Sequence, residues 1–184
     1  MRLRAVLVSV ILLLPMPMLA DSFTYTYTGN DFTNFNASGE PQVYTTSDFV
    51  SGEFTLSAPL ADYSGGYLDP TSFSFSDGYQ TISNINASDP TFYVLTNGEG
   101  AIIQWHITMY MNGSSNYDEL GTNGTIGSGG ADFGQYSDNE FNYASAGING
   151  TGTYGTWSVS TAATPEPASL MLVATWSARS FVPV

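Results

Sequence analysis

The side chains that could carry out nucleophilic or acid–base chemistry are few in this chain. His106 is the only histidine, and the chain contains no cysteine. A Ser-His-Asp triad would therefore have to use His106, and neither the HExxH spacing of a metalloprotease nor a Gly-x-Ser-x-Gly nucleophile elbow is present. Because His106 stands among alternating polar residues of a strand-like segment, we interpret it as a residue of a sheet surface.

Paired carboxylates that could hydrolyse a glycosidic bond are neighbours only in sequence. Asp118 with Glu119 and Asp138 with Glu140 are the nearest pairs. The two acids of a glycosidase usually come from separate strands around a deep cleft, which a small sandwich seldom provides. We therefore predict that the protein is not an enzyme, and we keep a small hydrolase as the third of three hypotheses.

Oxygen ligands for calcium are abundant, because the body of the chain carries many acids and no cationic competitor. The candidate ligands are Asp132, Asp138, Asn139 and Glu140, or alternatively Asp62 and Asp69. Neither set has the spacing of an EF-hand, and solvated loop acids that maintain solubility are the alternative interpretation. Apart from calcium, we expect no cofactor.

Several tyrosines lie in turn-rich segments, where exposed aromatic faces could stack on sugar rings. They are Tyr63, Tyr67, Tyr117, Tyr136 and Tyr143. This pattern is typical of a carbohydrate-binding module. Tyrosine also packs at the edges and corners of sandwiches, so a purely structural role is the alternative.

The charge of the chain excludes one class of partner. Sixteen acids oppose three bases, giving a net charge of −13, and residues 21–164 contain no lysine or arginine. A protein that binds DNA or RNA must neutralise phosphates with cations, so nucleic acid is excluded. Without cysteine, the body must be stable without disulfides.

The elements that position these residues are predicted to be β-strands. In residues 23–27, Phe-Thr-Tyr-Thr-Tyr, the aromatic side chains fall on one face and the threonines on the other, and Phe73-Ser74-Phe75 repeats the pattern. Further strands are predicted at Val43–Tyr44, Phe54–Leu56, Tyr79–Ile85, Thr91–Leu95, Ala101–Met111, Phe133–Tyr136 and Gly155–Ser160. Many short strands favour an all-β fold, an antiparallel β-sandwich or jelly roll.

Three Asx-Gly pairs predict tight hairpin turns, at Asp77-Gly78, Asn97-Gly98 and Asn112-Gly113. The segment Asn112–Gly130 is rich in glycine and asparagine, and we predict that it is a long exposed loop. The predicted core consists of Phe54, Leu56, Phe73, Phe75, Val94, Ile103, Trp105, Ile107 and Trp157.

The N-terminus has the pattern of a secretory signal peptide. Arg2 and Arg4 precede an apolar run from Ala5 to Leu14, and we predict cleavage between Ala20 and Asp21. An uncleaved anchor is the alternative, although the run is shorter than the ~20 residues that cross a bilayer. We therefore expect residues 1–20 to be a helical leader that directs export through the Sec translocon.

The C-terminus contains Pro165-Glu166-Pro167, followed by an apolar run from Ala168 to Ala174. It resembles the PEP-CTERM sorting signal, in which this tripeptide precedes an apolar segment and an arginine cluster. The resemblance implies that an exosortase-type enzyme recognises Pro165, Glu166 and Pro167, and that the chain belongs to an exopolysaccharide-producing, biofilm-forming bacterium. Segments Val50–Leu60 and Pro70–Gly78 also resemble proteins of this family.

The tail departs from the family pattern after Ala174, where Thr175-Trp176-Ser177 interrupts the apolar segment and Arg179 is the only arginine. The apolar run is about a third of the ~20 residues needed to span a bilayer, so we expect a degenerate tail with transient membrane association. A chance Pro-Glu-Pro is the alternative.

Together these features predict a leader at 1–20, a β-sandwich domain at 21–163 and a sorting tail at 164–184. The leading hypothesis is an exported, non-enzymatic protein of the cell surface or extracellular matrix. The alternative is a carbohydrate-binding module, with or without calcium, whose partner is an extracellular polysaccharide.

Overall fold

The computed structural model describes residues 22–38, 41–60, 65–113, 118–137, 141–146 and 154–162, and all regular elements in these ranges are β-strands. The strands form two antiparallel sheets of five and seven strands. This confirms the prediction of an all-β, sandwich-like fold. None of the described segments forms a helix with the length and hydropathy of a membrane span. The predicted leader and sorting tail lie outside the described residues.

The five-stranded sheet has the order β12-β1-β3-β5-β6. Its strands are β1 (Ser22–Thr28), β3 (Ser51–Leu56), β5 (Ser72–Ser76), β6 (Thr81–Ser83) and β12 (Thr156–Ala162). β1 is an interior strand between β12 and β3, and its aromatic side chains Tyr25 and Tyr27 are buried while Thr24 and Thr26 are only partly buried. The predicted alternation of β1 and β5 is confirmed.

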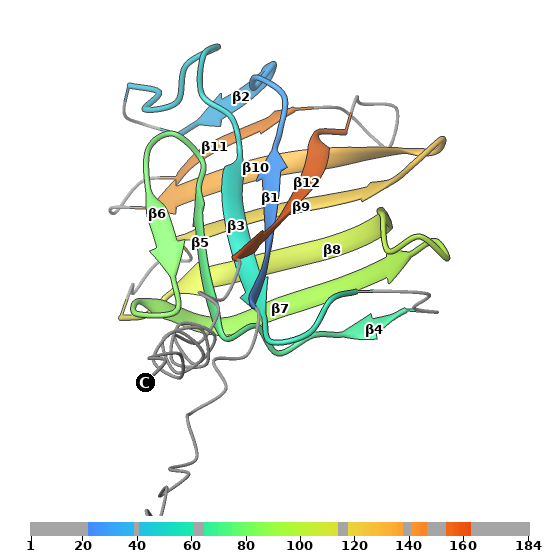
Figure 1. Ribbon diagram of the computed structural model, residues 1–184. Helices are drawn as coiled ribbons and strands as arrows, with labels where there is room; N and C mark the ends of the chain where they lie inside the picture. The colour runs from blue at the N-terminus through green and yellow to red at the C-terminus, as the bar shows by residue number, and fades with distance from the viewer. Residues whose placement is uncertain are drawn as a thin grey trace, which may run out of the picture.

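The seven-stranded sheet has the order β2-β11-β10-β9-β8-β7-β4. Its strands are β2 (Asn34–Ala37), β4 (Gly66–Tyr67), β7 (Ala87–Thr96), β8 (Ile102–Met111), β9 (Glu119–Thr125), β10 (Gly129–Ser137) and β11 (Phe141–Ala146). Figure 1 shows that its strands run across the direction of β1, β3 and β12, which lie in front of them. Such crossed sheets bury one face each, and the core lies between them.

Aromatic side chains from both sheets fill the core. Phe54 on β3 stacks on Tyr25 at 5.1 Å between ring centroids and meets Phe92 of the opposite sheet at 5.7 Å. Phe73 of β5 lies 5.0 Å from the same Phe92. The predicted core residues Phe54, Phe73, Phe75, Val94, Trp105 and Ile107 are buried, and Leu56 and Trp157 are partly buried against them.

The prediction that Ile103 belongs to the core is wrong, because a register shift interrupts the alternation of β8. Leu95 pairs with Gln104 while Thr96 pairs with Ile102, so Ile103 is an extra residue between two paired positions. Ile102 is buried in its place, and the alternation resumes at Trp105. A β-bulge of this kind cannot be read from a regular period of two.

The predicted exposed loop at Asn112–Gly130 is also wrong, because it contains β9 in the interior of the larger sheet. Its glycines make room for aromatic rings. A Cβ on Gly124 would lie 2.4 Å from Cζ2 of Trp105, and one on Gly121 would lie 2.8 Å from Cε1 of Phe133. We read these glycines as loop signals, whereas they permit close packing within a strand.

Other boundaries differ in smaller ways. Val43–Tyr44 is not a strand, the predicted strand at Tyr79–Ile85 reduces to β6, and β2, β4 and β11 were not predicted. Gly78 and Gly113 have the positive φ expected of their turns, but in the turn at Asn97 the positive φ belongs to Gly100 and not to Gly98. Asn97 instead fixes that turn, since its side-chain oxygen accepts hydrogen bonds from the N–H groups of Glu99 and Ala101.

Candidate ligand-binding pocket

A pocket of about 430 Å³ opens between the two sheets at the end where β12 faces the turns of the larger sheet. Its lining comes from β1, β12 and the residues just before β12 on one side, and from β8 and the β7–β8 and β9–β10 connections on the other. The residues are Tyr25, Gly100, Ala101, Ile102, Trp105, Ile126, Tyr154, Gly155, Thr156, Trp157, Ser158 and Val159. None of them carries a charge.

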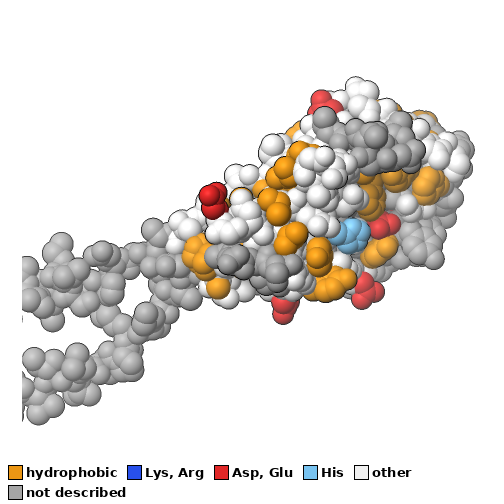
Figure 2. All heavy atoms as spheres, turned by 90° about the vertical axis from the view of Figure 1, so that its right-hand side faces the viewer, with side chains coloured by type: hydrophobic (Ala, Val, Ile, Leu, Met, Phe, Trp, Pro, Cys, Tyr) orange, Lys and Arg blue, Asp and Glu red, His pale blue; other side chains and the backbone are white. Residues whose placement is uncertain are grey.

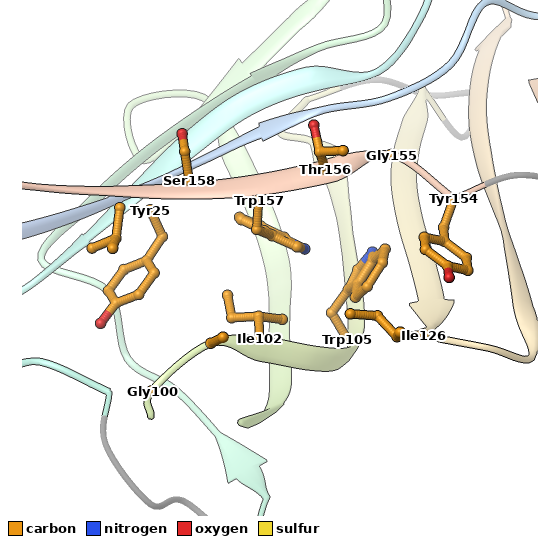
Figure 3. Close-up of a pocket in the computed structure, with 12 residues that line it drawn as sticks. Tyr25, Gly100, Ile102, Trp105, Ile126, Tyr154, Gly155, Thr156, Trp157 and Ser158 are labelled. Atoms are coloured by element: carbon orange, nitrogen blue, oxygen red, sulfur yellow. The ribbon is translucent and has the colours of Figure 1, made fainter. Parts of the chain in front are cut away.

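Four aromatic side chains line the space, those of Tyr25, Trp105, Tyr154 and Trp157. Trp157 and Trp105 meet in a T-shaped arrangement at 6.0 Å, and Tyr154 meets Trp105 in the same way at 6.0 Å. Figure 3 shows Tyr25 and Trp157 reaching from the smaller sheet toward Ile102 and Trp105. Edge-to-face packing fixes the orientation of each ring, so the aromatic faces of the pocket are held in place.

The rim of the pocket is apolar and open to solvent. Ile126 is 54% exposed and Val159 is 59% exposed, although both are large hydrophobic residues. Figure 2 shows several groups of hydrophobic side chains among polar ones on the face of the molecule that lies at the right of Figure 1. An exposed apolar rim around a concave, aromatic space is typical of a binding site.

The buried carboxylate of Asp132 is linked to the pocket wall by a chain of hydrogen bonds. Asp132 on β10 is 2% exposed, and its Oδ1 accepts a 2.8 Å hydrogen bond from the hydroxyl of Tyr27 on β1. The Tyr27 oxygen in turn accepts a 3.0 Å hydrogen bond from the N–H of Gly155, a pocket residue. The acid therefore fixes the start of β12 through one intervening side chain.

The second arm of this network holds Trp105. Its Nε1–H donates a 2.9 Å hydrogen bond to Oγ1 of Thr122, which also hydrogen-bonds to Asp132. Burial raises the pKa of Asp132 to about 6, against the hydrogen bonds that lower it. Burial, with the nearby Asp132 charge, also raises the pKa of Tyr27 above its usual range. The network joins both walls of the pocket, so the pocket is preformed.

One polar group of the pocket wall has no partner among the described residues. The indole Nε1–H of Trp157 is buried and donates to no acceptor there. Figure 3 shows this nitrogen at the end of the ring nearest Trp105. A buried donor without an acceptor costs about 1 to 3 kcal/mol, and such groups are few in folded proteins.

A second buried carboxylate, Asp77, joins the sheets away from the pocket. Its Oδ2 accepts hydrogen bonds from the hydroxyl of Tyr44 at 2.8 Å and from Nε2 of Gln80 at 3.0 Å. The same Nε2 donates to the carbonyl oxygen of Gln135 on β10 at 2.8 Å. Burial raises the pKa of Asp77, and we interpret it as a structural tether.

None of the predicted acid–base residues that the structure describes lines the pocket. His106 is exposed on the outer face of the larger sheet. Asp118 is buried and accepts a 2.8 Å hydrogen bond from the N–H of Ser137. Burial raises the pKa of Glu119, and a hydrogen bond from Tyr110 offsets this shift only in part. Asp138 and Glu140 lie outside the described residues.

The calcium prediction remains untested. Of the first ligand set, Asp132 is engaged in the buried network, and Asp138, Asn139 and Glu140 lie outside the described residues. Of the second, Asp69 is exposed and Asp62 lies outside them. Within the described ranges no three His, Asp or Glu side chains are grouped as metal ligands would be.

The tyrosines proposed to stack on sugars do not line the pocket. Tyr67 is 77% exposed on β4, Tyr136 packs against Tyr79 at 4.8 Å, and Tyr143 stacks with Phe141 at 6.2 Å. Tyr63 and Tyr117 lie outside the described residues. Tyr154, which does line the pocket, was missed, because it meets Trp105 only in the folded chain, where its hydroxyl accepts a 3.1 Å hydrogen bond from the N–H of Gly127 in the β9–β10 turn.

A comparison with protein-family models, with curated proteins and with solved structures finds no match to this chain. The resemblance to PEP-CTERM proteins therefore stays a prediction from the terminal motifs and shared segments. What the pocket binds must be argued from its own chemistry.

Proposed function

We propose that this is an exported, non-enzymatic protein of the cell surface or extracellular matrix, and that its sandwich binds a neutral polysaccharide in the pocket beside Trp157. The leader, Pro165-Glu166-Pro167 and the apolar tail support export through the Sec translocon and recognition by an exosortase-type enzyme. The single observation that carries the binding function is the uncharged, aromatic-lined pocket between the sheets.

The shape and chemistry of the pocket favour a sugar. Its volume falls in the range of about 300 to 1,000 Å³ that is usual for ligand sites. Aromatic faces such as those of Tyr154 and Trp157 can pack against the C–H face of a sugar ring.

Charge favours a neutral ligand over an anionic one. The chain has a net charge of −13, and residues 21–164 offer no lysine or arginine to bind a carboxylate or sulfate group. A uronic-acid polymer would therefore be repelled by the protein as a whole. A neutral glucan meets no such penalty.

Affinity electrophoresis of the exported product tests this proposal, using gels that contain either a neutral β-glucan or alginate. We expect retardation by the glucan and none by alginate. Tyr154→Ala removes an aromatic face and Ala101→Trp fills the pocket, so both should abolish the retardation. Tyr67→Ala, which removes an exposed tyrosine elsewhere, is the matched control. Equal retardation of all variants would exclude this pocket as the site.

The export part of the proposal has its own measurement. Mass spectrometry of the product recovered outside the producing cells should give an N-terminus at Asp21 and a C-terminus close to Pro165-Glu166-Pro167. An intact leader and tail on a protein retained in the cytosol would contradict it.

A further inference from the structure

The seven-residue strand β12 forms an open edge of the smaller sheet, and it differs from the other three edges of the sandwich. Those edges are β6, β2 and β4, with three, four and two residues. Proteins usually protect sheet edges by keeping them short or by placing charges, prolines or bulges on them. β12, with the sequence TWSVSTA, has none of these features, and its pairing with β1 is regular.

The hydrogen-bond pattern of β1 shows which groups of β12 face the open side. The N–H of Gly29 donates to the carbonyl of Val50 at 2.8 Å, one position beyond the paired residues Thr28 and Ser51. Bonded pairs alternate along an antiparallel ladder, so Tyr27 and the other odd-numbered residues of β1 bond to β3. The even-numbered residues therefore bond to β12.

The even-numbered residues of β1 pair with even-numbered residues of β12: Thr26 pairs with Ser158, and Thr24 pairs with Ser160. The backbone N–H and C=O groups of Trp157, Val159 and Thr161 therefore point to the open edge. No described strand pairs with them.

We propose that β12 pairs antiparallel with β12 of a second copy of this chain, in a two-fold register centred on Val159. Trp157 then lies opposite Thr161 of the second copy, and these positions with Val159 exchange roughly six backbone hydrogen bonds. The two Val159 side chains meet at the centre of the contact, where each is 59% exposed in the single chain.

Self-complementarity selects a second copy as the occupant, because an antiparallel β12–β12 pair centred on Val159 brings two identical, uncharged edges together. β12 carries no charged residue, although the chain as a whole has a net charge of −13. Pairing at this neutral strand lets two acidic chains meet without bringing their carboxylates together, whereas a basic peptide would find no acid on β12 to pair with. The resulting ten-stranded sheet carries two pockets, one beside each Trp157. This inference does not depend on what the pockets bind.

Sedimentation velocity of the chain with its C-terminal tail retained, over concentrations up to hundreds of micromolar, tests the pairing. We expect a monomer–dimer equilibrium whose Kd rises at least about tenfold in Ser158→Lys/Ser160→Lys, because lysines would lie directly opposite each other across the contact. Ser72→Lys/Ser74→Lys is the matched control, since it makes the same charge change on exposed positions of β5.

The two lysines lower the net negative charge, so their effect cannot come from general repulsion. In a cysteine-free chain the register can also be read by cross-linking. Ser158→Cys mixed with Ser160→Cys should give a disulfide-linked dimer, and each variant alone should give far less. A chain that stays monomeric at all concentrations would overturn the proposal, and this result is expected if residues 163–184 of the same chain cover the edge. A dimer that both lysine pairs weaken equally would also overturn it.

Discussion

The hydroxyl of Tyr27 donates a 2.8 Å hydrogen bond to the carboxylate of Asp132, and this contact joins the five-stranded sheet to the seven-stranded sheet. The described residues contain no lysine or arginine, and the buried acids are instead hydrogen-bonded by hydroxyl groups, a glutamine amide and backbone N–H groups. Elsewhere in the core the hydroxyl of Tyr44 donates a hydrogen bond to the carboxylate of Asp77 in the same way. Two tyrosine–carboxylate pairs therefore hold the sandwich together where salt bridges cannot form.

Removal of one hydroxyl should destabilise the fold. Tyr27→Phe leaves Asp132 with one donor fewer and the N–H of Gly155 without its acceptor. We expect the free energy of unfolding to fall by about 1 to 3 kcal/mol, measured by urea denaturation. Tyr67→Phe removes a hydroxyl from a largely exposed side chain and should leave the urea midpoint unchanged. Equal midpoints for both variants would show that the buried hydrogen bond contributes nothing.

The buried acids make the fold more stable in mild acid. The pKa of Asp132 rises from 3.8 in the unfolded chain to about 6 in the folded protein, and burial raises that of Asp77 as well. The folded state therefore binds protons more tightly, so this stability is complete below pH ~4 and is lost as the pH rises through ~6. Asp132 alone can contribute up to about 3 kcal/mol.

Urea midpoints at intervals between pH 4.5 and pH 8 measure this effect. Self-repulsion of the acidic chain acts in the same direction, so Asp132→Asn is the necessary comparison. The variant should lose part of the slope around pH 6 that the parent chain shows. A parent chain that becomes more stable as the pH rises would contradict the assignment of a raised pKa.

The glycines of β9 should be intolerant of a side chain. A methyl group at Gly124 would overlap the ring of Trp105, and moving that ring would disturb its hydrogen bond to Thr122. We expect Gly124→Ala to cost about 1 to 3 kcal/mol of stability. Asn123→Ala alters the next residue on the outer face of the same strand and should be close to neutral. Thermal unfolding of the two variants side by side makes the comparison.

The sequence predicts the fold class and much of the core because one-faced alternation is a local signal. Phe73 and Phe75 of β5 and Tyr25 and Tyr27 of β1 are buried on the faces that the period of two indicates. The failures arise where a non-local contact changes the meaning of a local pattern. Gly121 and Gly124 are indistinguishable from loop glycines until Phe133 and Trp105 are placed against them.

The pocket could be predicted only in part for the same reason. Trp105 and Trp157 were expected in the core, and both contribute to its wall. Tyr154 and Ile126 reach it from connections on opposite sheets, and nothing in the spacing of one sequence relates them. Asp132 was singled out as a calcium ligand because carboxylates favour that ion, whereas its pairing with Tyr27 depends on how the sheets cross.

We propose that a neutral polysaccharide occupies the pocket beside Trp157, and tryptophan fluorescence tests this directly. Acrylamide quenching of tryptophan fluorescence in a Trp176→Phe background reports mainly on Trp157, because Trp105 is buried. We expect saturating β-glucan to lower the quenching constant of the parent chain. In the Ala101→Trp variant the quenching constant should be the same with and without glucan. Binding of the glucan with unchanged quenching of Trp157 would contradict the claim.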